Sequence, residues 1–140
     1  MSTRCVTHFT WGGKVQARVY RHCDGYPSGA GTDILRFLRD VEAQTRDTRF
    51  NDPSYLAAKY VVWLAGQFAN GDKPLDFLSV GVVLEDPGDI EFRYVIECGQ
   101  RGTHPKVACF DVDGNGANGG ECEIPPLPAD EKPWRGGPRT

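Results

Sequence analysis

The chain has 140 residues, of which 39% are hydrophobic, and this is enough for one compact domain with its own core. Its formal net charge of −3 argues against general nucleic-acid binding, which needs a basic surface, and against a DNA mimic, which would be far more acidic. No apolar run reaches the length that spans a bilayer, and the N-terminus lacks the apolar core of a signal peptide. We therefore expect a cytoplasmic protein without membrane contact.

The first two predicted strands cover residues 4–11 and 14–23. They are joined at Gly12-Gly13, a dipeptide suited to the positive φ angles of a tight hairpin. Strand alternation places the odd-numbered residues of the second strand on one face, which is apolar until Arg21 interrupts it. The pattern therefore puts a guanidinium on the side of the sheet that faces the core.

Two helices are predicted next. Thr32 is suited to cap the first, and its apolar stripe runs from Ile34 to Val41, with polar residues such as Asp40 largely opposite. Asp52-Pro53 begins the second, with Asp as cap and Pro at the first helical position. This helix is apolar nearly all round and ends at Asn70-Gly71, so we expect it to be buried on several sides.

Three more strands complete the predicted domain. Residues 77–85, FLSVGVVLE, are continuously apolar and are predicted to form a central strand. Residues 90–98 alternate well, and residues 106–112, KVACFDV, are predicted to form the last strand. The order ββααβββ predicts an α+β fold, an antiparallel sheet with two helices on one face.

The composition changes after residue 112. Residues 113–140 are rich in Gly and Pro, so we predict an extended or disordered tail behind a single domain of residues 1–112. Docking of this tail on a partner stays open, because it contains Trp134 and the IPPLP stretch, residues 124–128. The partner would be a host protein or a neighbouring subunit, and in the second case the protein would be a homo-oligomer.

The stretch YRHCDGYPSGAG, residues 20–31, is the main candidate site. It combines Arg and His at a strand end, glycines that permit unusual backbone paths, and a helix start with unpaired N–H groups. Together these suit an anion such as a phosphate or a carboxylate, and a tyrosine could stack on a base or sugar. The predicted ligand-binding residues are Arg21, His22, Asp24, Gly25, Tyr26, Gly29, Gly31 and Thr32.

Two other interpretations of this stretch stay open. In the structural one, Arg21 and Asp24 form an internal ion pair and the corner holds no ligand. In the catalytic one, His22 is a general base that Asp24 orients, provided that extended geometry persists through the turn. Cys23 points to the face opposite His22, so the two would not meet as nucleophile and base.

Metal sites have less support. Asp111, Asp113 and Asn115 match the first ligand positions of a calcium loop, but Cys122 stands where the closing Glu is expected and no helix follows. A Gly/Asn-rich exit from the last strand explains the same residues.

The five cysteines are odd in number and lack CxxC spacing, so we interpret most of them as reduced, buried residues. A zinc site drawn from Cys98, His104 and Cys109 lacks the paired ligand spacing of structural zinc. The sequence indicates no cofactor.

Residues Val19 to Leu38 resemble the N-terminal signature of a family of small uncharacterised proteins from phages and bacteria, with the pattern YRHxDGYPxGxGxxLxxFL. Cys23 falls at a variable position of that pattern, which argues further against a nucleophile. The resemblance implies a phage or mobile-element context, in which small non-catalytic proteins bind and neutralise host components.

From these observations we expect a small binding protein in preference to an enzyme. Its expected ligand is an anionic small molecule, above all a nucleotide. In a phage it would act in anti-defence by sequestering a nucleotide immune signal in the cytoplasm of the host. The alternative is a protein–protein inhibitor or adaptor of a host or phage system, in which the RHCDGYP corner is structural. A hydrolase that uses His22 and Asp24 is the third hypothesis.

Overall fold

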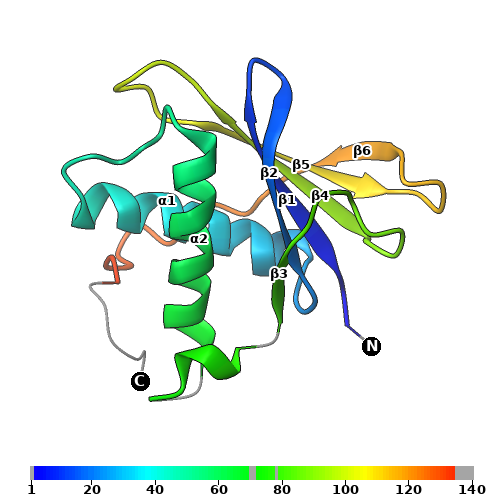
Figure 1. Ribbon diagram of the computed structural model, residues 1–140, viewed down its shortest axis with the longest axis horizontal. Helices are drawn as coiled ribbons and strands as arrows, with labels where there is room; N and C mark the ends of the chain where they lie inside the picture. Colours follow the sequence, from blue (N-terminus) through cyan, green and yellow to red (C-terminus); the bar gives the residue numbers. More distant parts are fainter. Residues whose placement is uncertain (1, 70–71, 78, 135–140) are drawn as a thin grey trace.

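The computed structural model describes residues 2–69, 72–77 and 79–134, and it shows a six-stranded mixed sheet with two helices (Figure 1). The α+β class is confirmed, as is the order of two strands, two helices and further strands. The elements are β1 (Cys5–Trp11), β2 (Lys14–Arg21), a π-turn (Pro27–Gly31), α1 (Thr32–Gln44), α2 (Pro53–Phe68), a 3-10 turn (Pro74–Asp76), β3 (Val80–Val82), β4 (Phe92–Cys98), β5 (Lys106–Val112) and β6 (Asn118–Cys122).

The N-terminal hairpin forms as predicted. Gly12 and Gly13 have φ angles of 57° and 77°, the positive values that a tight two-residue turn between twisted strands requires. Trp11 pairs with Lys14 directly across that turn. The hairpin places Arg21 at the end of β2, on the side of the sheet that packs against the helices.

The strand order is β3-β2-β1-β4-β5-β6, and β1 pairs with β4 in parallel while every other neighbouring pair is antiparallel. The sheet is therefore mixed, where the sequence predicted antiparallel pairing throughout. Since β3 and β4 run in the same direction, the chain between them must cross back over β2 and β1. The carboxylate of Asp86, in this crossover, lies 2.6 Å from Nε2 of His8 and 2.9 Å from Nε of Arg93.

The prediction of a central strand in residues 77–85 is wrong. Of the described residues in this range, Val80–Val82 alone form a strand, and this strand, β3, lies at the edge of the sheet. Val82 is 74% exposed and Leu84 is 91% exposed. The centre belongs instead to β1 and β4, and an apolar run alone does not tell a central strand from an exposed edge.

The prediction that β5 is the last strand is also wrong. Residues Asn118–Cys122, inside the predicted tail, form β6 and pair antiparallel with β5. The turn between them is built on Asp113, whose Oδ1 accepts hydrogen bonds from the N–H groups of Asn115 and Ala117. Residues 135–140 of the predicted tail lie outside the described residues.

Both helices pack into one core with the sheet. Asp52 caps α2 as predicted, because its Oδ1 accepts the N–H of Tyr55 at 3.3 Å. Helix α2 is not buried on several sides, however: Val62 is 70% exposed. The predicted stop at Asn70-Gly71 lies outside the described residues. The core residues shared by helices and sheet include Phe9, Val19, Ile34, Phe37, Leu38, Tyr60, Leu64, Tyr94 and Ile96.

No helix in the described parts of the chain is both long enough and apolar enough to cross a membrane.

Candidate functional site

Arg21 is buried, with 7% of its surface exposed, as the strand alternation predicts. Its Nη1 donates to Oδ2 of Asp33 at 2.8 Å, and its Nε donates to the carbonyl oxygen of Cys23 at 2.8 Å. The ion pair therefore forms with Asp33, in the first turn of α1, and not with Asp24. The charge of Arg21 is neutralised within the protein, which is what allows it to be buried.

Asp24 turns the chain between β2 and α1. It has a φ of 58°, in the left-handed region, and its carbonyl oxygen accepts the N–H of Ala30 at 2.8 Å. Its carboxylate accepts a hydrogen bond from the Tyr26 hydroxyl at 3.2 Å. Extended geometry thus ends before Asp24, which removes the condition under which Asp24 would orient His22.

His22 lies on the other face of the sheet. Its Nδ1 is 2.8 Å from the Tyr20 hydroxyl and accepts a hydrogen bond of 3.4 Å from Nε of Arg4. The carboxylate of Asp24 is not among its contacts. Asp24 therefore does not orient His22, and the two predicted catalytic residues are not brought together.

The glycines of the corner are needed for close packing. A Cβ at Gly25 would lie 2.9 Å from the Cβ of Cys5, and one at Gly29 would lie 2.4 Å from the carbonyl oxygen of Asp24. A Cβ at Gly31 would approach Ile124 to 3.1 Å. Their smallness fits the structural interpretation of the motif, because the space that a ligand would need beside them is filled by protein.

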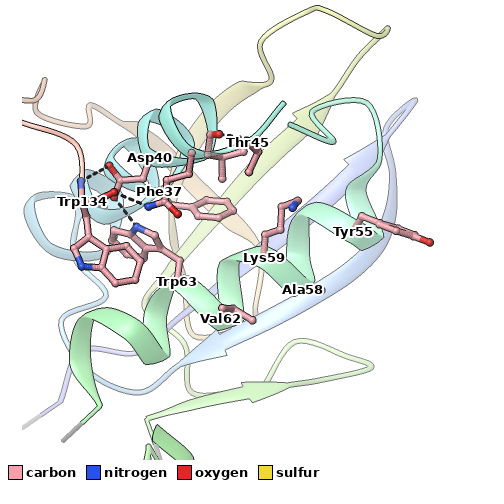
Figure 2. Close-up of a pocket in the computed structure, with 11 residues that line it drawn as sticks. Phe37, Asp40, Thr45, Tyr55, Ala58, Lys59, Val62, Trp63 and Trp134 are labelled. Carbon is pink, nitrogen blue, oxygen red and sulfur yellow. Dashed lines mark hydrogen bonds between the residues drawn. The ribbon is translucent and has the colours of Figure 1, made fainter. Parts of the chain in front are cut away.

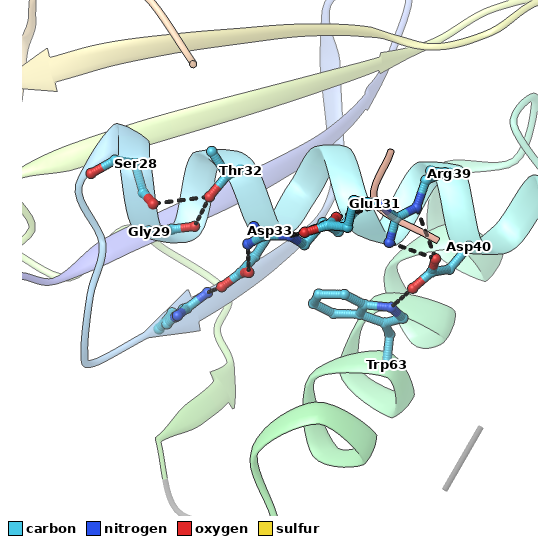
Figure 3. Close-up of polar contacts among 10 residues, drawn as sticks. Ser28, Gly29, Thr32, Asp33, Arg39, Asp40, Trp63 and Glu131 are labelled. Atoms are coloured by element: carbon cyan, nitrogen blue, oxygen red, sulfur yellow. Dashed lines mark hydrogen bonds and ion pairs between the residues drawn. The ribbon is translucent and has the colours of Figure 1, made fainter. Parts of the chain in front are cut away.

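The start of α1 differs from the prediction. Thr32 does not accept a capping hydrogen bond: its hydroxyl donates to the carbonyl oxygens of Ser28 and Gly29, at 2.9 and 3.0 Å (Figure 3). The preceding π-turn runs directly into α1 and uses the N–H groups of Gly29, Ala30 and Thr32 for its own hydrogen bonds. These N–H groups are therefore not available to a ligand.

A pocket of about 520 Å³ opens beside Arg21, and we call it the Arg21 pocket. Of the predicted ligand-binding residues, Arg21 and Asp24 line it. Sequence reasoning missed its other walls, because no motif connects the end of α2 and the segment before β3 to residue 21. The lining residues are Arg21, Cys23, Asp24, Phe68, Ala69, Asp76, Phe77 and Ser79.

Aromatic rings and carboxylates surround the guanidinium in the Arg21 pocket. The rings of Phe68 and Phe77 are stacked, with centroids 6.5 Å apart, and the guanidinium carbon of Arg21 is 5.1 Å from the Phe68 centroid. Nη2 of Arg21 has no hydrogen-bond partner among the described residues. Because Asp24 and Asp76 add negative charge, the pocket suits a planar group with an acceptor better than a polyphosphate.

The chain after β6 is docked on both helices. Glu131 accepts a hydrogen bond from Nε of Arg36 at 3.1 Å, and the N–H of Trp134 donates to Oδ1 of Asp40 at 2.9 Å (Figure 2). The indole of Trp134 packs so closely on α2 that a Cβ at Gly66 would lie 2.5 Å from the ring. These contacts bury Asp40, which the helical pattern placed on the polar face.

The candidate metal residues serve other roles. Asp113 holds the β5–β6 turn, and within the described residues no group of three or more His, Cys, Asp or Glu side chains is placed to bind a metal ion. Burial raises the pKa of Cys98 to about 11 and that of Cys109 to about 12, so both thiols stay protonated at neutral pH. His104 packs its ring against Phe50, with centroids 5.0 Å apart.

The resemblance of residues 19–38 to a phage and bacterial family stays a prediction. Comparisons with family models, with curated proteins and with solved structures gave no match to this chain.

Proposed function

We propose that the protein is a small-molecule-binding protein and that the Arg21 pocket is its binding site. One observation carries the proposal: a buried guanidinium, fixed by Asp33 and by the Cys23 carbonyl, forms part of the wall of a pocket beside two stacked phenylalanine rings. Because the Arg21 side chain is already held in one orientation, it loses little further conformational entropy when a ligand binds.

The side chains that line the Arg21 pocket indicate the class of ligand. The Phe68 and Phe77 rings favour a planar aromatic group, and Nη2 of Arg21 favours an acceptor oxygen or nitrogen. The carboxylates of Asp24 and Asp76 oppose a highly charged anion. We therefore propose a nucleoside or a nucleoside monophosphate, which narrows the expected nucleotide to one with few phosphates. In a phage context, binding would sequester a nucleotide signal of the host.

Calorimetric titration with adenosine, guanosine and their mono- and triphosphates tests the proposal. We expect the monophosphate of the preferred base to bind more tightly than its triphosphate. Phe77→Ala removes half of the aromatic wall and should abolish binding, whereas Leu75→Ala, at a neighbouring residue that is 97% exposed and does not line the pocket, should leave it unchanged. Equal binding by these two variants, or no binding of any of these compounds, contradicts the proposal.

Asp76→Asn tests whether the negative charge of this carboxylate selects against ligands with several phosphates. Removing this carboxylate should strengthen binding of the triphosphate more than binding of the nucleoside, because only the phosphates are repelled by it. If the variant changes both affinities alike, the carboxylate does not select against phosphate.

A second candidate is a protein–protein inhibitor or adaptor that acts through β3. Val82 and Leu84 are exposed at this edge, and an exposed apolar edge strand can pair with a strand of another protein. Capture of one partner from host extract should be lost in Val82→Lys. It should persist when the chain is cut after Pro128, because that cut removes Glu131 and Trp134 but keeps β6. The reverse pattern would assign binding to the tail instead.

A further inference from the structure

The groove between α1 and α2 is a second hollow, and it shares no lining residue with the Arg21 pocket. Its volume is about 430 Å³, within the range of small-molecule sites in proteins. Its apolar walls come from Phe37 of α1, from Val62 and Trp63 of α2 and from Trp134 of the docked tail (Figure 2). Val41 of α1 also lines it. A groove of this size, lined mostly by carbon, favours an apolar body.

Most polar side chains that line the groove are already used within the protein. Asp40 accepts hydrogen bonds from Nε1 of Trp63 at 2.8 Å and from the N–H of Trp134 at 2.9 Å. The Thr45 hydroxyl donates to a carbonyl oxygen of α1 at 2.7 Å, and the Gln44 amide donates to the carbonyl oxygen of Trp134. These groups shape the groove and leave little capacity for a ligand.

Lys59 is the charged side chain to which this does not apply. It is half-buried on α2, extends into the space between the two helices (Figure 2), and has no ion pair or hydrogen bond with any described residue. Among the described residues that line the groove, Asp40 is the only one with a carboxylate, and its charge is compensated by Arg39 at 3.0 Å. The groove thus has one uncompensated positive charge beside apolar and aromatic walls.

We infer that this groove binds a small aromatic carboxylate, with the ring against the aromatic side chains that line the groove and the carboxylate on Nζ of Lys59. One cation matches one anionic group, and a dianion would leave a charge uncompensated in an apolar groove. The aromatic walls favour a planar ring over an alkyl chain, because ring pairs add attraction beyond the area that they bury. The inference goes beyond the proposed function, since it concerns another site and another class of ligand.

Titration with 2-naphthoate, followed by tryptophan fluorescence, tests the inference because Trp63 and Trp134 both line the groove. We expect saturable quenching. Lys59→Met keeps an unbranched side chain, one atom shorter, without the charge. It should weaken binding about five- to tenfold, the value of one charge-assisted contact in a half-open site. Lys59→Arg should retain binding, and Lys106→Met, on β5, is the control and should equal the wild type. The neutral analogue 2-naphthalenemethanol should bind the wild type as weakly as 2-naphthoate binds Lys59→Met.

Val62→Glu is the second variant, and it should not affect folding, because Val62 is 70% exposed. The new carboxylate stands one helical turn from Lys59, so it should pair with the ammonium group and compete with the ligand. Wild-type affinity in both Lys59→Met and Val62→Glu, or no quenching at all, overturns the inference. So does a dimer in light scattering that Val62→Glu makes monomeric, since a second copy would then fill the groove. Nucleoside monophosphate binding by Lys59→Met should be normal, which separates this site from the Arg21 pocket.

Discussion

Replacing Asp33 with Asn keeps the shape of the side chain that Arg21 contacts but removes its charge. The two side chains are 8% and 11% exposed, so the guanidinium would be left buried without a counter-charge. Removing one partner of a buried ion pair costs about 3–5 kcal/mol. Because the amide oxygen still accepts from Nη1 and the Phe68 ring remains 5.1 Å away, we expect about 3 kcal/mol. For a domain of this size, this lowers Tm by about 10 °C.

Urea unfolding, monitored by circular dichroism, measures this loss. Asp47→Asn is the matched control, because the Arg49–Asp47 pair is 40% and 56% exposed and should contribute less than about 0.5 kcal/mol. The double variant Arg21→Met, Asp33→Leu removes both charges and should be more stable than Asp33→Asn alone. The role of Asp33 as the counter-charge of buried Arg21 would be refuted by either of two results. In the first, Asp33→Asn costs no more free energy of unfolding than Asp47→Asn. In the second, the double variant is less stable than Asp33→Asn.

Three further predictions concern other parts of the molecule. Gly29→Ala should cost about 1–3 kcal/mol in thermal melts, because its Cβ would meet a backbone oxygen at 2.4 Å, whereas Gly114→Ala, in open space, should cost little. Burial lowers the pKa of His8 below 6.5, so the unfolded state binds more protons and the free energy of unfolding should fall as the pH drops from 7 to 5. His8→Gln should flatten that dependence. Trp134→Ala should speed cleavage after Glu131 by a glutamate-specific protease, because the indole that holds the tail on α2 is gone.

Each of these has a contradicting outcome. Equal melting of the two alanine variants would mean that the β2–α1 corner has room to relax. An unchanged pH slope in His8→Gln would assign the acid sensitivity to other groups. Unchanged cleavage in Trp134→Ala would mean that Glu131 alone holds the tail in place.

The N-terminal half of the fold can be predicted from sequence because its signals are local. The Gly12-Gly13 turn, the Asp52 cap and the alternation that buries Arg21 each depend on neighbouring residues, and each is present. The partner of Arg21 was not predictable in the same way. Asp33 is twelve residues away, and only the path of the π-turn decides that it, and not Asp24, reaches the guanidinium.

In the C-terminal half, the strands predicted at residues 90–98 and 106–112 form as β4 and β5. The predictions that fail there are those that depend on long-range contacts. The apolar run before β4 looks central because hydrophobicity does not report strand order, yet Val82 and Leu84 are exposed. The Gly-rich segment after β5 looks unstructured, but pairing with β5 is enough to make it a strand. Burial of Asp40 needs Trp134, which lies 94 residues further along the chain.

The parallel pair at the centre of the sheet has a consequence for biosynthesis. β1 begins at Cys5, but its second neighbour, β4, begins only at Phe92. At translation rates of about 5–20 residues per second, the β1–β2 hairpin, complete at Arg21, must wait roughly 4–14 seconds with one apolar edge open. A nascent chain halted before residue 92 should therefore bind chaperones, and release should coincide with the synthesis of β4.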